Sequence, residues 1–143
     1  MKSIIRHQQI PTDFTSLDHS SLPINLDGLT ERHGRFLLME VKTGTEGIAG
    51  GQAWALRSLA GHKEFTILLV HVKFHEVSAN GTRPFEPESY SIIAENMIRT
   101  RVETSTEDFK ARYAAWFDGD NAAFEYTTDD LRRDYEETRV ERN

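Results

Sequence analysis

The chain contains no cysteine, and this single absence excludes disulfides, thiolate-bound zinc and cysteine nucleophiles. It also lacks any apolar run long enough to cross a bilayer. Its first residues, MKSIIRHQQIPTDF, hold no hydrophobic segment of the length found in a signal peptide. We therefore expect a protein that has no membrane contact and works in the cytoplasm.

Excess positive charge is missing as well. Lysine and arginine together number 17 against 23 aspartates and glutamates, which gives a formal net charge of −6 at pH 7. That sign is wrong for a protein that holds duplex DNA by bulk electrostatics alone. Half of the excess lies in residues 125–143, so the rest of the chain is nearer to balance.

What the chain does have is the size and composition of a globular domain. With 143 residues, of which 38% are hydrophobic and 28% charged, it is long enough to bury a core and is not biased toward disorder. No internal repeat or low-complexity segment interrupts it. We expect one domain over residues 1–124, followed by a charged helix or tail over residues 125–143.

Hydrophobic periodicity predicts a mixed α/β fold. A strand at 24–32 precedes an almost continuous apolar strand at 35–42, of the kind that is covered on both faces. An amphipathic helix at 48–60 then leads to a second strong strand at 65–74. Because a helical crossover joins them, the last two strands are suited to lie parallel in a central sheet.

The remaining elements are a turn, a strand and a second helix. His33-Gly34 is a plausible hairpin corner, and a weaker strand is expected around 90–102. A helix over 104–117 begins with Ser105 as its N-cap and has acidic residues in its first turn. Its buried stripe, which we assign to the core rather than to base stacking, consists of Phe109, Tyr113 and Trp116.

Glu40 and Lys42 interrupt an apolar face of the strand at 35–42. Residues two apart on a strand point the same way, so both lie on one face while Val41 points to the other. Asp27 lies on the preceding strand, and a hairpin would bring it near Glu40. Two carboxylates can bind a hard divalent cation through oxygen, and a lysine beside them can orient water or offset charge on a phosphate.

A second acid-x-lysine sequence, Asp108-Phe109-Lys110, lies in the expected second helix. Residues i and i+2 of a helix do not share a face, so we reject it as a site. The copy at Glu40 has further support from the Asp-Gly pair upstream, because glycine leaves space beside the carboxylate. It is also followed by a helix that opens with a polar residue, Gln52.

The pattern LDGLTERHGRFLLMEVKTG…GQ, over about residues 24–75, resembles the PD-(D/E)xK nuclease superfamily and looks like small nuclease-like proteins of bacteriophages. The resemblance implies a restriction-endonuclease-like core, with a mixed central sheet flanked by helices. The metal ligands that it implies are Asp27, Glu40 and the Val41 carbonyl, and the catalytic residues are Asp27, Glu40, Lys42 and Gln52.

The function that follows is a metal-dependent nuclease that hydrolyses DNA phosphodiester bonds with Mg²⁺ or Mn²⁺ as its cofactor. A chain of 143 residues leaves no room for a separate sequence-reading domain, so we expect recognition of DNA structure or ends. A homo-oligomer in the cytoplasm of a bacterial host is one expected arrangement. The basic residues expected to contact DNA are Lys42, Arg57, Lys63 and Lys73.

Other interpretations stay open. Asp27-Gly28 is a favoured turn pair, and Glu40 with Lys42 could be a surface ion pair worth ~0–1 kcal/mol. The chain could also be a catalytically inactive, acidic binding protein on a nuclease fold, acting as an inhibitor of a host nuclease or as a DNA mimic. The charge of −6 supports that alternative, and Lys42 argues against it.

His71 and His75 alternate with Lys73 on one face of the strand at 65–74. A lysine between two histidines argues against a metal site. We therefore expect this face to be a solvated or phosphate-facing strand edge.

Overall fold

The computed structural model describes residues 15–18, 26–44 and 46–126. They belong to two compact units, one with residues 15–18 and 75–84 and the other with residues 26–74 and 85–126. The smaller unit contains a single turn of 3-10 helix, Thr15–Leu17. Every residue predicted for the catalytic site lies in the larger unit. Most of the expected charged tail, from residue 127 onward, lies outside the described residues.

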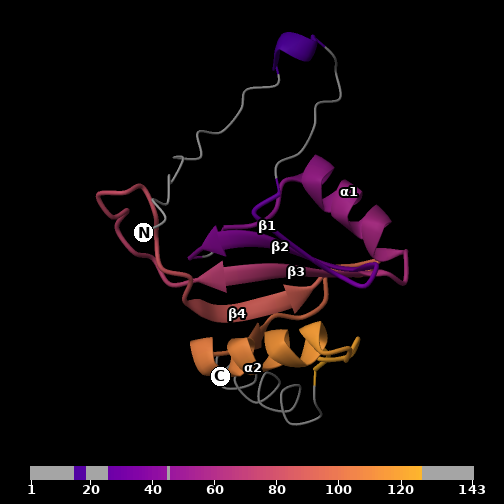
Figure 1. Ribbon diagram of the computed structural model, residues 1–143. Coiled ribbons are helices and arrows are strands. Elements are labelled where there is room, and N and C mark those ends of the chain that lie inside the picture. The colour runs from indigo at the N-terminus through magenta and orange to yellow at the C-terminus, as the bar shows by residue number, and fades with distance from the viewer. Residues whose placement is uncertain (1–14, 19–25, 45, 127–143) are drawn as a thin grey trace, which may run out of the picture. The chain divides into compact units, whose positions relative to one another are not determined.

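The larger unit is a mixed α/β fold, as the sequence predicts, and it is built on one five-stranded sheet (Figure 1). The strands lie side by side in sequence order: β1 (Gly28–Arg32), β2 (Arg35–Thr43), β3 (Phe65–Val72), β4 (Pro87–Ile92) and β5 (Val102–Glu103). The β2 and β3 strands run parallel, and the other neighbouring pairs are antiparallel. The predicted parallel pairing across a helical crossover is therefore confirmed.

Two helices cover opposite faces of this sheet (Figure 1). Helix α1 (Gly50–Ala60) connects β2 to β3 and packs on β3 through its buried Leu56. Helix α2 (Thr106–Phe117) packs on β4 from the other side. Because side chains alternate along a strand, the two faces of the sheet carry different sets of residues.

The turn between β1 and β2 is the predicted one. His33 has φ 52° and Gly34 has φ 78°, so both adopt the left-handed conformation that a tight hairpin corner requires. The Glu31 Oε1 atom accepts a hydrogen bond from the Gly34 backbone N at 2.9 Å. The corner sets the register of the hairpin, in which Gly28 pairs with Met39.

The expected single strand around 90–102 is wrong. The chain leaves β4 after Ile92, turns back with an Ala94 N to Met97 O hydrogen bond of 2.8 Å, and forms the separate two-residue β5. This turn contains neither glycine nor proline, and its turn-favouring residue is Asn96, so the sequence signal for it is weak. Smaller differences occur at element ends, since α1 begins at Gly50 and β3 ends at Val72.

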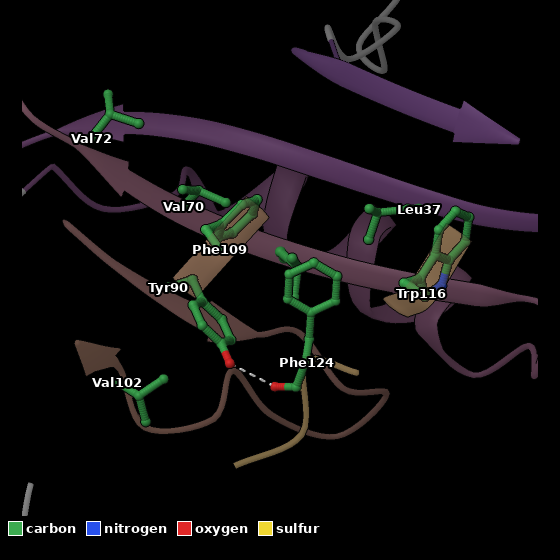
Figure 2. Packing of buried hydrophobic residues seen from close by; sticks show 9 residues of the cluster. Leu37, Val70, Val72, Tyr90, Val102, Phe109, Trp116 and Phe124 are labelled. Atoms are coloured by element: carbon green, nitrogen blue, oxygen red, sulfur yellow. Dashed lines mark hydrogen bonds between the residues drawn. The ribbon is translucent and has the colours of Figure 1, made fainter. Parts of the chain in front are cut away.

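The main hydrophobic core lies between the sheet and α2 (Figure 2). Its members are Leu37, Leu68, Val70, Val72, Tyr90, Val102, Phe109, Trp116 and Phe124. Phe109 and Trp116 are 3% and 1% exposed, which confirms the core assignment of the aromatic stripe for these two residues. The hydroxyl of buried Tyr90 donates a hydrogen bond to Phe124 O at 2.8 Å, so the polar end of that ring is satisfied.

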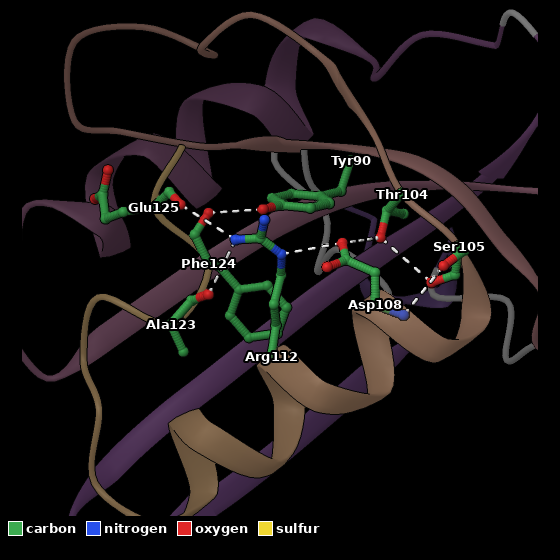
Figure 3. A network of polar contacts seen from close by, with 8 residues as sticks. All are labelled: Tyr90, Thr104, Ser105, Asp108, Arg112, Ala123, Phe124 and Glu125. Atoms are coloured by element: carbon green, nitrogen blue, oxygen red, sulfur yellow. Dashed lines mark hydrogen bonds and ion pairs between the residues drawn. The ribbon is translucent and has the colours of Figure 1, made fainter. Parts of the chain in front are cut away.

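A polar network fixes the start of α2 and the segment that follows the helix (Figure 3). Asp108 Oδ2 accepts hydrogen bonds from Thr104 Oγ1 at 2.7 Å and from Arg112 Nε at 3.1 Å. Arg112 Nη1 in turn donates to the backbone oxygens of Ala123 and Glu125, both at 3.2 Å. The acid of the rejected acid-x-lysine sequence thus has a structural role.

The predicted N-cap of α2 is confirmed and gives a stability prediction. Ser105 Oγ accepts a hydrogen bond from Asp108 N at 3.1 Å. Substituting Ser105→Ala leaves that donor without its partner and is expected to reduce the free energy of unfolding by about 1 kcal/mol. Urea denaturation measures the loss, and Ser58→Ala, an exposed position inside α1, is the control with an expected change within ~0.5 kcal/mol. Equal losses in the two variants would contradict the capping role.

Candidate active site

The structure brings the four side chains predicted for catalysis to one place in the larger unit. Glu40 and Lys42 lie in β2, Asp27 lies one residue before β1, and Gln52 lies in the first turn of α1. The Lys42 Nζ atom is 3.4 Å from Glu40 Oε1. The side chain of Gln52 hydrogen-bonds to Glu40, and the Asp27 carboxylate is close enough to act on the pKa of Glu40.

Asp27 reaches the site through the hairpin. The register pairs Gly28 with Met39, so one further step along both strands places Asp27 opposite Glu40. The Asp27 Oδ2 atom accepts a hydrogen bond from the Val41 backbone N at 2.8 Å. Asp27 is therefore not only a turn residue, because it closes the end of the hairpin with a side chain where the strand pairing stops.

The backbone of Val41 faces the same edge as Asp27. In an antiparallel pair, the N–H and C=O groups of one residue point toward the same neighbouring strand. Since the Val41 N–H points to Asp27, the Val41 carbonyl also faces this edge. Its side chain packs against the main core on the other face of the sheet. The expected third oxygen ligand is thus on the side where the carboxylates lie.

Glu40 is buried to an unusual degree for a carboxylate, with 6% of its surface exposed. Its partner Lys42 has a side chain 22% exposed, so the alternative of a solvated surface ion pair does not describe this contact. No described residue hydrogen-bonds to the Oε2 atom of Glu40, although that atom is buried. A buried oxygen without a protein partner is unfavourable unless a water molecule or an ion satisfies it.

Burial raises the pKa of Glu40 above its ordinary value of 4.5. The hydrogen bond from Gln52 lowers it, the negative charge of Asp27 raises it, and the positive charge of Lys42 lowers it. The net result is a raised pKa. The folded protein therefore holds a negative charge here less readily than the unfolded chain does.

The donor set fits a hard divalent cation. Among the described residues, no three histidine, cysteine, aspartate or glutamate side chains come together as a metal-binding group. The site instead offers two carboxylates, a backbone carbonyl and one buried oxygen that lacks a hydrogen-bond partner within the described chain. Mg²⁺ commonly keeps several waters and binds proteins through only one or two carboxylates, so these oxygens suffice for it.

His71 is a residue of this face whose surroundings the sequence did not predict. It pairs in register with Lys42 on one side and Ser89 on the other, which places it in the same row of the sheet. The expectation of a solvated strand edge is wrong for His71, which is only 3% exposed, but it holds for Lys73, whose side chain is 59% exposed. The segment after β2 and the segment before β5 both contact its ring.

Two contacts compete for one nitrogen of His71. Its Nε2 atom lies 2.9 Å from Glu46 O and 2.8 Å from Arg101 Nη2. Arginine only donates and a carbonyl only accepts, so a single ring nitrogen can satisfy one of them at a time. Arg101 is therefore held beside the row that contains Lys42, and nothing in the local sequence indicated it.

The other basic residues predicted to contact DNA are dispersed. Lys73 lies beyond the end of β3 and pairs with Glu86 at 3.7 Å, which offsets its charge. Arg57 lies on α1, and Lys63 lies in the connection from α1 to β3. The structure thus brings Lys42 alone of this group to the carboxylates.

The chain matches no protein-family model, no curated protein and no solved structure. None of the helices in the described ranges is long and apolar enough to cross a membrane.

Proposed function

We propose that this protein is a metal-dependent nuclease that hydrolyses DNA phosphodiester bonds, with Mg²⁺ or Mn²⁺ as its cofactor. The observation that carries the proposal is the convergence at Glu40. A buried carboxylate, with an oxygen that no described residue satisfies, meets a second carboxylate, a lysine and a glutamine from three different segments. Burying charged groups in this way is costly, and apolar side chains of similar volume would fill a purely structural role at least as well.

Each residue of the cluster has a role in this proposal. Asp27, Glu40 and the Val41 carbonyl would hold the cation, which supplies charge to polarise a phosphate and lowers the pKa of a bound water. Lys42, beside Glu40, would offset the negative charge that develops on the phosphate oxygens in the transition state. Gln52 would keep the Glu40 carboxylate oriented through its hydrogen bond.

The order of the strands and helices supports the same proposal. A hairpin carrying the carboxylates, a helical crossover carrying the glutamine and a parallel strand match the order expected of a restriction-endonuclease-like core. A phage-type member of the PD-(D/E)xK group, acting in the cytoplasm of a bacterial host, is the family we propose. With a net charge of −6, the chain should select DNA by structure or ends rather than by broad electrostatic contact.

Substituting Lys42→Ala tests the proposal directly. Wild-type protein should cut at least one of supercoiled, linear, single-stranded or branched DNA with Mg²⁺ or Mn²⁺, and EDTA should stop it. The variant should lose roughly 100- to 1000-fold in rate, because it loses a charge that acts on the transition state. Gel assays of initial rates measure this. Lys110→Ala is the matched control, since Lys110 ends the second acid-x-lysine sequence and is exposed on α2.

Two results would contradict the proposal. One is a well-folded wild-type protein that cuts none of these substrates with either cation. The other is metal-dependent cutting that Lys42→Ala and Lys110→Ala retain equally, because such activity would come from elsewhere or from a contaminant. Absence of cutting would favour the alternative of an inactive, acidic protein that binds a host nuclease or mimics DNA, for which the charge of −6 is the supporting observation.

A further inference from the structure

Helix α1 exposes a tryptophan. The Trp54 side chain is 71% exposed, more than any other large hydrophobic residue in the described parts of the chain. Tryptophan is a large and mainly apolar side chain, and a single one left in water is unfavourable by the area it could have buried. The only other tryptophan of the sequence, Trp116, is 1% exposed. Trp54 is therefore a candidate for contact with something outside the chain.

A fixed arginine lies against this ring. The Arg57 guanidinium carbon is 5.3 Å from the centroid of the Trp54 ring, within the range of a cation–π contact. The Arg57 Nε atom donates to Glu95 O at 3.2 Å, and its Nη2 atom donates to Asn96 O at 2.8 Å. These hydrogen bonds attach the guanidinium to the loop after β4. The guanidinium therefore has a fixed position beside the aromatic ring.

The charge of Arg57 stays available to an anionic ligand. Its two hydrogen-bond acceptors are backbone carbonyls, which position the guanidinium without neutralising it. Among the described residues, no carboxylate forms an ion pair with Arg57. An aromatic face beside an uncompensated positive charge is complementary to a nucleotide, whose base stacks and whose phosphate is negative.

The surface formed by Trp54 and Arg57 lies on the same helix as a residue of the candidate active site. Gln52 contacts Glu40, and Trp54 follows it by two residues, or about 200° around the helix axis. Trp54 therefore points outward, about one helix diameter of 10–12 Å from the Gln52 side. At roughly 3.4 Å for each nucleotide of a stacked strand, this distance corresponds to at least about three nucleotides, because the strand has to pass around the helix.

We propose that Trp54 and Arg57 form a stacking site for an unpaired base, a few nucleotides away from the phosphate held at the Glu40 cluster. The inference rests on the proposed nuclease function and adds a substrate class to it, namely DNA with a single-stranded segment. Stacking suits a protein without a sequence-reading domain, because every base has a π face and the contact tolerates any sequence.

The two tryptophans make a direct experiment available. An oligothymidylate of roughly 12 nucleotides is titrated into the protein in EDTA, so that binding is measured without cleavage. Tryptophan emission should be quenched to saturation, and a blunt duplex should quench it less. Trp54→Phe should remove the emission change, because the buried Trp116 is screened from the ligand. Anisotropy of a labelled oligonucleotide reports binding independently of tryptophan.

The oligonucleotide affinities of variants distinguish base stacking from nonspecific hydrophobic binding. Trp54→Ala should weaken oligonucleotide binding about tenfold or more, and Trp54→Phe should retain most of the affinity because it keeps an aromatic face. Phe74→Ala is the matched control, since Phe74 is 68% exposed but lies two residues beyond the end of β3 rather than on α1. It should bind like wild type. Circular dichroism and urea denaturation check that each variant is folded.

Several outcomes would overturn the inference while leaving the nuclease proposal intact. Wild-type affinity in Trp54→Ala would do so, as would binding by anisotropy without any change in tryptophan emission. Concentration-dependent self-association that is lost in Trp54→Ala, with unchanged DNA affinity, would assign the surface to a second copy of this chain. Stacking as described but no cleavage under any condition would instead uphold the inference and reject the nuclease.

Discussion

Replacing Glu40 with glutamine is expected to lower the cleavage rate by on the order of a thousandfold and yet stabilise the fold at neutral pH. The loss of rate follows because the variant removes the negative oxygen that the cation and the phosphate chemistry require. The gain in stability follows from burial, since Glu40 is 6% exposed and one of its oxygens lacks a hydrogen-bond partner in the described chain. Glutamine fills the same volume without the charge, and Lys42, which loses its ion-pair partner, has a side chain 22% exposed through which water can reach its ammonium group.

The pH dependence of this effect has a definite sign. Burial raises the pKa of Glu40 in the folded protein above its ordinary value of 4.5. The stability that Glu40 contributes is therefore fully present below pH 4.5 and is lost as pH rises through the folded pKa. The difference in free energy of unfolding between Glu40→Gln and wild type should be small near pH 4 and should grow toward pH 7, in favour of the variant.

Urea denaturation in EDTA across this pH range measures the difference, and assays with Mg²⁺ measure the rate. Glu88→Gln is the matched control because Glu88 is an exposed glutamate on β4, and it should change neither quantity by much. Adding Mg²⁺ should raise the stability of wild type more than that of Glu40→Gln, since a ligand stabilises only the state that binds it. A stability difference that is flat with pH, or one that favours wild type at pH 7, would contradict the account of Glu40.

The hairpin explains why so much of the site could be predicted from the sequence. Strand alternation alone puts Glu40 and Lys42 on one face, and a corner at His33-Gly34 pairs Gly28 with Met39. One step more places Asp27 opposite Glu40. These are short-range relations in which the period of two and the turn position fix the outcome. Gln52 follows from helix periodicity in the same way, because it shares a stripe with Leu56, which is buried against the sheet.

The burial of His71 could not be predicted from the sequence. Alternation correctly puts His71 on the face of β3 opposite Val70, but it does not say whether that face is open or covered. The covering groups, Glu46 O and Arg101, lie 25 and 30 residues away along the chain. Such contacts depend on how a loop and a distant strand pack, and no local period encodes them. The turn after Ile92 was also missed, because a single asparagine, Asn96, is a weak signal for a turn.

Replacing Trp116 with alanine is expected to reduce the free energy of unfolding by about 3–5 kcal/mol, the range for truncating a buried tryptophan. Trp116 is 1% exposed in the core on the α2 face. Its ring also receives the Arg35 guanidinium at 4.4 Å, and its backbone oxygen accepts from Arg35 Nη2 at 2.7 Å. Truncation would leave a cavity and take away the surface on which Arg35 lies. Domains of this size are stable by only ~5–15 kcal/mol, so this loss is a large fraction of the total stability.

Trp54→Ala is the control for this prediction, because the second tryptophan is 71% exposed and its removal should change stability by no more than ~0.5 kcal/mol. Urea denaturation followed by circular dichroism compares the two without relying on tryptophan emission. A loss below about 1 kcal/mol in Trp116→Ala would contradict the packing of α2 on the sheet. Trp116 packs on the face opposite Glu40, so at low temperature the folded fraction of Trp116→Ala should retain its DNA cleavage rate. A defect in both properties would instead mean that the two faces of the sheet are coupled through β2.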